Sequence, residues 1–219
     1  MKPSLFLTDD GSHSLRDARF GASYHSTYGA VKESRHVFIQ AGLEDLLATH
    51  ATIPILEMGF GTGLNALLVR QLADLNPSID FHYTTYEQYP VSPRQVRKLN
   101  FPEVLACPPA WLYELHDADW ETVHHLTPNF TLLKHRQDFL AGPQDAAQVI
   151  FYDAFAPEQQ PELWTVAAME HCYRLLAPGG RLVTYCAKGQ FKRNLRAVGF
   201  RVEGLPGPVG KREMTRALI

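Results

Sequence analysis

Short apolar runs alternate along the chain with segments in which leucine recurs every three or four residues. Runs typical of buried strands occupy residues 53–61, 79–87, 130–138, 147–155 and 181–187. Helical spacing occupies residues 64–75, 161–177 and 191–200, and Ser92 followed by Pro93 marks the start of another helix. Strands that alternate with helices predict a parallel sheet covered by helices, which is an α/β fold.

The end of the chain departs from this alternation. Residues 200–219 predict two short strands around a loop rich in glycine and proline. We therefore expect a mostly parallel seven-stranded sheet whose last strand runs antiparallel, in a single domain spanning residues 1–219. Residues 1–50 precede the first core strand, and residues 101–130 contain four prolines and no clean period. The second segment predicts an irregular insertion that packs on the sheet edge or over the site.

Charge is distributed unevenly along the chain. The 219 residues are 45% hydrophobic and carry a formal net charge of −2. Residues 188–219 hold eight basic and two acidic side chains, so this end carries +6 and the remainder −8. A basic region of this kind is typical of a nucleic-acid contact surface, but a solvated face produces the same pattern.

The cysteines and histidines indicate neither a disulfide framework nor a metal site. Cys107, Cys172 and Cys186 are far apart in sequence, which fits a reducing compartment. His124 and His125 are the only close histidine pair, and no acid-histidine motif follows them. The first residues are polar or charged where a signal peptide needs an apolar core, so we expect none, and no apolar run is long enough to span a membrane. We expect a soluble cytoplasmic protein that binds no metal and no membrane.

The strongest motif is LEMGFGTGLN, in which three glycines separate a strand from a helix. Glycines permit positive φ and let a ligand approach the backbone. A dinucleotide-binding fingerprint would need a glycine where Leu64 stands. The pattern Glu57-x-Gly59-x-Gly61-x-Gly63 instead resembles motif I of the S-adenosylmethionine-dependent methyltransferases, which implies that cofactor and a Rossmann-like class I fold. A glycine turn that only packs a helix on a strand is the alternative.

Three acidic residues follow predicted strands. Glu87 ends the second strand, where its carboxylate can accept both ribose hydroxyls of the cofactor, unless it is an ordinary surface acid. Asp138 ends the third strand, where methyltransferases of this fold place a ligand of the adenine amino group; capping a helix is the alternative. Asp153 ends the fourth strand and should face the transferable methyl. All three lie at carboxyl ends of strands, where open α/β sheets bind ligands.

The residues after Asp153 indicate an acceptor site for an amine. Asp-Ala-Phe-Ala-Pro echoes the Asp/Asn-Pro-Pro-aromatic loop of amino-methylating enzymes, in which a polar group holds an exocyclic amine and an aromatic stacks on the base. A carboxylate that accepts an N–H bond orients the amine and offsets its developing positive charge. Asp153 and Phe155 are therefore candidate catalytic residues, although burial under the loop explains Phe155 as well.

Six blocks of sequence, in order along nearly the whole chain, resemble one family. They are YHSTYGAVKESRHVFIQAGL, LEMGFGTGLNALL, YEQYPVSPRQ, YDAFAPEQQPELWT, LAPGGRLVTYCAKGQFKRNLRAVGF and GPVGKREM. These blocks resemble the MnmD and N-terminal MnmC methyltransferases, which complete 5-methylaminomethyl-2-thiouridine at the wobble position of tRNA. The resemblance implies that S-adenosylmethionine methylates the primary amine of 5-aminomethyl-(2-thio)uridine at position 34 of the anticodon stem-loop.

The resemblance also implies roles for individual residues. The residues matching the cofactor site are Glu57, Gly59, Gly61, Gly63, Asn65, Glu87 and Asp138. The residues matching substrate-binding segments are Tyr24, Ser26 and Tyr28, in an N-terminal segment (residues 1–50) that covers the active site, and Lys211 and Arg212 in a tail block. Three further basic residues follow the fifth strand: Lys188, Lys192 and Arg193. They contact phosphate or belong to a solvated helix face.

Two departures limit the resemblance. Relatives more often have glycine where Ala154 stands, so this residue adds a methyl group that could narrow the acceptor pocket. Many relatives continue into a flavin-dependent oxidase domain, which we do not expect in this chain because it stops at Ile219. A small-molecule amine methyltransferase and a catalytically idle binding module are the alternative functions.

Overall fold

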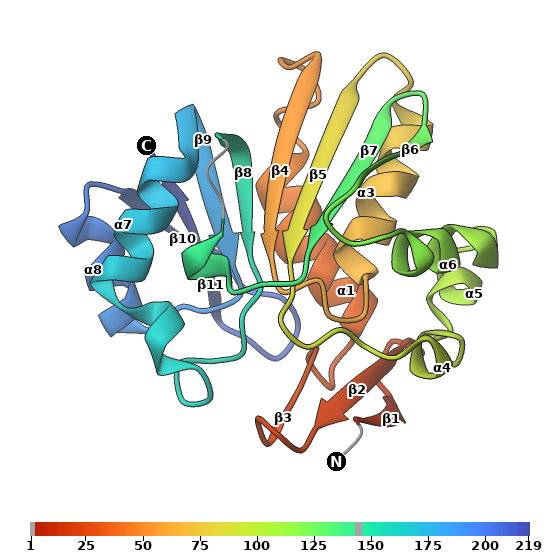
Figure 1. Cartoon of the computed structure of the whole chain (residues 1–219). Helices are drawn as coiled ribbons and strands as arrows, with labels where there is room; N and C mark the ends of the chain where they lie inside the picture. The colour runs from red at the N-terminus through yellow and green to blue at the C-terminus, as the bar shows by residue number, and fades with distance from the viewer. Residues whose placement is uncertain (1–2, 143–145) are drawn as a thin grey trace.

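The computed structural model describes residues 3–142 and 146–219, and its centre is an eight-stranded sheet (Figure 1). In chain order the strands are β4 (Thr52–Met58), β5 (Asp80–Tyr86), β6 (Val123–Thr127), β7 (Phe130–His135), β8 (Ala147–Tyr152), β9 (Leu176–Thr184), β10 (Arg201–Pro206) and β11 (Glu213–Leu218). Their order across the sheet is β10-β11-β9-β8-β4-β5-β7-β6. Strands β9, β8, β4, β5 and β7 are parallel, whereas β11 and β6 run antiparallel to them.

The central position of β8 follows from its sequence. All six of its residues are buried, which suits a parallel strand covered on both faces. Val149 and Phe151 belong to one hydrophobic core and Ile150 and Tyr152 to the other, because successive side chains point to opposite faces. Asp153 is the first polar residue after this run. It therefore emerges at the carboxyl end of β8, beside the end of β4.

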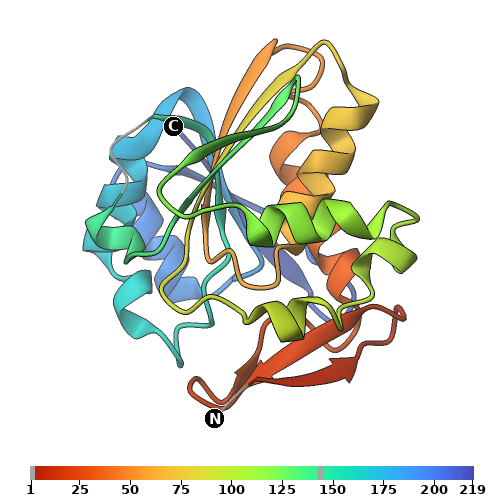
Figure 2. The same ribbon diagram turned by 45° about the vertical axis from the view of Figure 1, so that its right-hand side comes forward.

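Helices cover both faces of the sheet. They are α1 (Ala30–Ser34), the π-helix η1 (Arg35–Gln40), α2 (Ala41–Leu43), α3 (Leu64–Leu75), α4 (Pro93–Val96), α5 (Phe101–Val104), α6 (Pro109–Asp117), the 3-10 helices η2 (Phe139–Ala141) and η3 (Pro161–Trp164), α7 (Val166–Leu175) and α8 (Gly189–Ala197). Figures 1 and 2 show α7 and α8 on one face and α1, α3 and α6 on the other. Within the described ranges, no helix has both the length and the apolar content needed to span a membrane.

A smaller antiparallel sheet is built from β1 (Ser4–Leu7), β2 (His13–Asp17) and β3 (Ala22–Ser23). It lies beyond the carboxyl ends of the parallel strands in both views (Figures 1 and 2). Asn100 ties it to the main body: its Oδ1 accepts from the His13 backbone N–H at 2.7 Å, and its Nδ2 donates to the Gly11 carbonyl at 2.8 Å. This attachment places the N-terminal segment next to the strand ends.

Several sequence predictions are confirmed. Helix α3 has the predicted bounds, β11 is antiparallel as predicted for the last strand, and Ser92 caps α4 with Pro93 in its first turn. The predicted number of strands is wrong. The sheet has eight strands rather than seven, because β6 forms inside the segment that was predicted to be irregular.

Residues 101–130 also contain two helices, so the prediction of an irregular insertion is wrong. Pro102 and Pro109 stand in the first turns of α5 and α6, where a missing N–H breaks no helical hydrogen bond. The helix predicted for residues 161–177 is interrupted as well. Thr165 caps a new start for α7, and the chain from Leu176 onward pairs with β8 as strand β9.

Candidate active site

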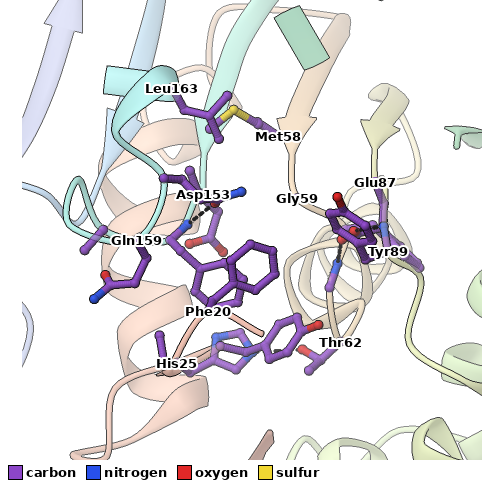
Figure 3. Close-up of a pocket in the computed structure, with 18 of the residues that line it drawn as sticks. Phe20, His25, Met58, Gly59, Thr62, Glu87, Tyr89, Asp153, Gln159 and Leu163 are labelled. Atoms are coloured by element: carbon purple, nitrogen blue, oxygen red, sulfur yellow. Dashed lines mark hydrogen bonds between the residues drawn. The ribbon is translucent and has the colours of Figure 1, made fainter. Parts of the chain in front are cut away.

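A cavity of about 530 Å³ opens at the carboxyl ends of β4, β5 and β8, a volume within the usual range of small-molecule sites (Figure 3). Among its lining residues are ten that the sequence predicted to bind cofactor or substrate or to act in catalysis: Tyr24, Ser26, Gly59, Gly61, Asn65, Glu87, Asp138, Asp153, Phe155 and Lys211. Asp153 and Glu87 lie on opposite sides of the cavity (Figure 3). The fold thus assembles one site from the N-terminal segment, the ends of β4, β5, β7 and β8, and the C-terminal hairpin.

The loop from β4 to α3 forms one wall of the cavity, and two of its glycines allow close approach. Gly59 has φ 90°, and a Cβ there would lie 3.0 Å from the Asp153 carbonyl oxygen. Gly61 has φ 51°, and a Cβ there would lie 2.9 Å from the Tyr24 ring. Both positions therefore require glycine, for their backbone conformation and for the space they leave. Gly63 lies outside the cavity lining and precedes the first turn of α3.

Two histidines hold this loop at Thr62. His25 Nε2 lies 2.8 Å from the Thr62 hydroxyl, and His116 Nε2 donates to the Thr62 carbonyl at 3.0 Å. Burial lowers the pKa of both imidazoles to about 4, so both are neutral near pH 7. Sequence reasoning assigned neither residue a role. His25 stands in a quoted block, but His116 comes from α6, in the segment predicted to be irregular.

Glu57 lies behind the glycine loop rather than in the cavity wall, and it is 1% exposed. Its carboxylate accepts from Asn65 Nδ2 at 3.0 Å and from the Thr85 hydroxyl at 2.8 Å. Burial raises the pKa of Glu57 to about 7, and these hydrogen bonds oppose the rise. The Glu57 carboxylate therefore anchors the glycine loop from the side that faces away from the cavity.

Asp153 faces the cavity from the end of β8. Its carboxylate accepts from Asn65 Nδ2 at 2.9 Å. Burial raises the pKa of Asp153 well above its usual value, and the nearby Glu57 carboxylate raises it further. A carboxyl group with a raised pKa holds a proton more readily than an exposed aspartate does.

The turn after Asp153 is fixed by side chains that bond its backbone. Phe155 N–H donates to Gln160 Oε1 at 3.0 Å, and Trp164 Nε1 donates to the Phe155 carbonyl at 2.9 Å. The Tyr185 hydroxyl donates to the Ala154 carbonyl at 2.8 Å. Ala154 is 6% exposed and belongs to the second hydrophobic core, so most of its methyl group is enclosed by protein.

Aromatic rings form the wall around Phe155. Phe20 stacks on Phe155 with ring centroids 4.5 Å apart, and Tyr24 meets it edge-on at 5.3 Å. Tyr89 contacts Phe20 edge-on at 5.9 Å. Phe155 is half-buried and lines the cavity, so part of its ring packs under the loop and part is open to the cavity. Phe20 and Tyr89 were missed, because no spacing rule marks an aromatic residue in a loop.

Glu87 and Asp138 lie at the ends of β5 and β7. The Glu87 carboxylate accepts from Gly61 N–H at 3.0 Å and Tyr89 N–H at 2.7 Å, and burial raises its pKa. Asp138 lines the cavity and also accepts from Leu140 N–H at 3.0 Å, which caps η2 as the alternative interpretation expected. Each carboxylate still has lone pairs available for a ligand.

Lys211 joins the C-terminal hairpin to the N-terminal segment. Its Nζ lies 2.7 Å from the buried Glu33 carboxylate and 3.8 Å from the centroid of the Tyr185 ring. The other Glu33 oxygen accepts from the Ser26 backbone N–H at 2.8 Å. Glu33 was also missed as a site residue. One buried carboxylate thus holds both segments in place at the cavity.

The remaining predicted substrate residues lie outside the cavity lining; they are Tyr28, Lys188, Lys192, Arg193 and Arg212. The exposed Tyr28 packs its ring against Gly210. Lys188 is paired with Glu158, and Lys192 with Glu213 at 2.6 Å. Arg193 and Arg212 are exposed and form no ion pair within the part of the chain that the structure describes. Residues 3–142 and 146–219 contain no cluster of metal-ligating side chains.

Comparisons with known proteins agree with this geometry. A family model described as S-adenosyl-L-methionine-dependent methyltransferase matches residues 131–219. The chain is 34% identical to the tRNA 5-methylaminomethyl-2-thiouridine biosynthesis bifunctional protein MnmC of Aromatoleum aromaticum, over 97% of this chain and 34% of that protein. It is 32% identical to the Cupriavidus necator protein of the same name, over 91% of this chain and 32% of that protein. It thus spans about a third of the length of these curated relatives.

The crystal structure of MnmC2 from Aquifex aeolicus superimposes with a TM-score of 0.78 and 25% identity, covering 98% of this chain and 70% of that chain. The chain belongs to the MnmC methyltransferase family. Its predicted Rossmann-like class I methyltransferase fold is confirmed by this match.

The cavity suits the cofactor of the MnmC methyltransferase family, S-adenosyl-L-methionine, which carries an ammonium, a sulfonium, two ribose hydroxyls and an adenine. The acids that line the cavity are Glu33, Glu87, Asp138, Asp153 and Glu162, and the strongly basic residues that line it are Arg16 and Lys211. A predominantly acidic wall favours a cationic ligand. In addition, Asn65 Oδ1 is buried without a hydrogen-bond partner among the described residues, and an N–H donor would satisfy it. The residues present therefore fit this cofactor.

Replacement of Glu87 tests the cofactor site. Glu87→Gln removes the negative charge. It also turns the amide NH2 group toward the backbone N–H of Gly61 or Tyr89, both of which donate to the carboxylate in the wild type. We expect the Kd for S-adenosyl-L-methionine, measured by calorimetry, to rise about 10- to 100-fold. Glu103→Gln, at an exposed position on α5, should bind as the wild type does. Equal affinity of Glu87→Gln and wild type would contradict the assignment.

Proposed function

We propose that this protein methylates the primary amine of 5-aminomethyl-(2-thio)uridine at the wobble position, residue 34, of tRNA, using S-adenosyl-L-methionine and giving 5-methylaminomethyl-(2-thio)uridine. The observation that carries the proposal is the largely buried Asp153 carboxylate, which ends β8 opposite Gly59 of the cofactor loop and faces a cavity with an aromatic wall. The MnmC relatives are named for tRNA 5-methylaminomethyl-2-thiouridine biosynthesis, which supports the choice of RNA and nucleoside.

Asp153 is proposed to orient the acceptor amine. Bound S-adenosyl-L-methionine would supply a methyl group on a positively charged sulfur: the bond from the amine nitrogen to the methyl carbon forms as the carbon–sulfur bond breaks, and the sulfur leaves as a neutral thioether. Asp153 accepts an N–H bond, so that the nitrogen lone pair points away from the carboxylate and toward the cofactor side of the cavity. Its negative charge stabilises the positive charge that develops on nitrogen. The product amine then loses one proton, and the raised pKa of Asp153 makes this carboxylate a competent acceptor.

The aromatic rings are proposed to hold the uracil ring. Phe155 and Phe20 present stacked faces at the cavity, and the anticodon loop is single-stranded, so its bases can leave the stack and pack on such rings. The Phe155 backbone is fixed by Gln160 and Trp164, which makes it the rigid partner. Phe20 belongs to the N-terminal segment, residues 1–50, which we propose covers the site.

The exposed arginines are proposed to contact the RNA backbone. Lys188 and Lys192 are already paired with glutamates, which weakens their attraction for phosphate. Arg193 in α8 and Arg212 in the hairpin loop are exposed cations on elements next to the carboxyl end of the sheet. They replace the paired lysines as the stronger candidates.

Methyl transfer tests the activity directly. Labelled S-adenosyl-L-methionine, the purified protein and tRNA from a strain that lacks the final methyl group should yield label in the wobble nucleoside. Asp153→Asn should bind the cofactor within a few-fold of wild type and slow transfer by about 10²- to 10³-fold, because the amide carries no charge to balance the reacting nitrogen. Asp119→Asn, at an exposed position, serves as the control. Label absent from that nucleoside would reject the proposed substrate, and full activity of Asp153→Asn would reject the proposed role.

Charge reversal tests the RNA surface. Arg193→Glu and Arg212→Glu should each weaken tRNA binding and lower the slope of log Kd against log salt by about one, since each removes a phosphate contact. Arg174→Glu, on the last turn of α7, is the matched control because this exposed arginine lies toward the opposite end of the sheet. Binding and slopes identical to the control would contradict the proposed surface.

A further inference from the structure

Two carboxylates, the buried Glu57 and the half-buried Asp153, accept from a single amide nitrogen at the junction of β4, β8 and α3. Asn65 Nδ2 donates to Glu57 Oε1 at 3.0 Å and to Asp153 Oδ2 at 2.9 Å. Asn65 is 3% exposed and is the second residue of α3. The contacts fix the orientation of the amide, because the reversed one would direct Oδ1 at two carboxylates. Both N–H groups are therefore committed, one to each acid.

The anchor at the Glu57 end is rigid. Glu57 lies on β4 and accepts a second hydrogen bond from the Thr85 hydroxyl on β5 at 2.8 Å. Asn65 is held in the first turn of α3 by the packing of Leu64 and Leu67, which are almost fully buried. The amide therefore presents its second N–H to Asp153 from a fixed position. The Asp153 carboxylate is oriented by a group outside its own loop.

Within the described residues, Asn65 is the only hydrogen-bond donor to the Asp153 carboxylate. The titratable groups that face Asp153 are Glu57 on β4, Glu33 on α1, Lys211 in the hairpin loop, Tyr83 on β5 and Tyr185 after β9. The two glutamates disfavour the ionised form of Asp153, and Lys211 favours it. Lys211 is already paired with Glu33, so its net help is small. This leaves the Asn65 amide as the main group that stabilises a charged Asp153.

We propose that Asn65 is the positioning residue of the acceptor site: it couples the strand acid Glu57 to Asp153, holds the Asp153 carboxylate turned toward the acceptor amine, and favours its ionised form. The inference rests on the proposed function insofar as Asp153 receives an amine. The geometry also explains the buried Asn65 Oδ1, which lacks a partner among the described residues. With both N–H groups bound, this oxygen is left for a donor on a ligand in the cavity that Asn65 lines.

Asn65→Leu, which keeps a similar volume and removes both N–H donors, tests the proposal. Carbon-13 NMR of aspartate-labelled protein gives the Asp153 titration, assigned by its loss in Asp153→Asn. Loss of the donor should raise the pKa of Asp153 by about one to two units. The acidic limb of the pH profile of methyl transfer should move to higher pH by the same amount, because the carboxylate ionises later. A merely structural role would lower stability and move neither midpoint.

Two further variants keep the test decisive. Asn129→Leu is the matched control: the Asn129 side chain also donates from Nδ2, to the carbonyls of Ala73, Asn76 and Ile79 at the other end of the sheet, and its loss should leave the Asp153 titration unchanged. Asn65→Asp places a third carboxylate between Glu57 and Asp153, and the midpoint of the Asp153 titration should rise further than in Asn65→Leu. It is measured whether or not Asn65→Leu folds.

The outcomes separate this inference from the proposed function. The NMR titration needs neither cofactor nor RNA. A shifted midpoint in a protein that does not methylate the wobble nucleoside would retain the positioning role of Asn65 and reject the proposed substrate. The opposite outcome is methylation by the wild type together with an Asp153 titration midpoint that does not change in Asn65→Leu. Asn65→Asp is used for this comparison if Asn65→Leu does not fold. That outcome would overturn the inference and retain the function.

Discussion

The pair of hydrogen bonds from Asn65 to the buried Glu57 and the half-buried Asp153 is the constraint on which the site depends. Burying a charged carboxylate costs several kcal/mol unless it is paired or hydrogen-bonded. Glu57 and Asp153 incur that cost together because β4 and β8 are neighbours in the parallel sheet. Asn65 and Thr85 offset part of it. The cost that is not offset keeps the pKa of Asp153 raised, and Asp153 is one of the acids in the cavity wall that favour a cationic ligand.

The elements around this pair serve to keep the glycine loop in place. Gly59 and Gly61 let the Asp153 backbone and the Tyr24 ring approach, and His25 and His116 hold Thr62 from two directions. The N-terminal segment and α6 therefore contribute to the cofactor loop although neither belongs to the parallel sheet. Since the same N-terminal segment supplies Phe20, the loop that fits the cofactor and the ring proposed for the base are mechanically connected.

Local signals predicted most of the framework and part of the site. The leucine spacing of α3, the apolar run of β8 and the strand-end acids follow from rules of short range, and the structure places Asp153 and Glu87 at one cavity. Strand β6 and His116 escaped prediction, because a segment with four prolines has no clean period even when two of those prolines stand in helical first turns. The ion pairs of Lys188 and Lys192 join residues that are distant in sequence, and so does the hydrogen bond from Asn65 to Asp153. The sequence pattern does not contain such contacts.

The central claim is that the cavity holds the cofactor and the acceptor on the two sides defined by Glu87 and Asp153. A crystal structure of the protein with S-adenosylhomocysteine and a 5-aminomethyl-uridine nucleoside tests it most directly. The account predicts ribose hydroxyls at the Glu87 carboxylate, the cofactor sulfur beside the glycine loop, and the aminomethyl nitrogen within hydrogen-bond distance of Asp153. A nucleoside amine bound away from Asp153, or a cofactor bound outside this cavity, would contradict it.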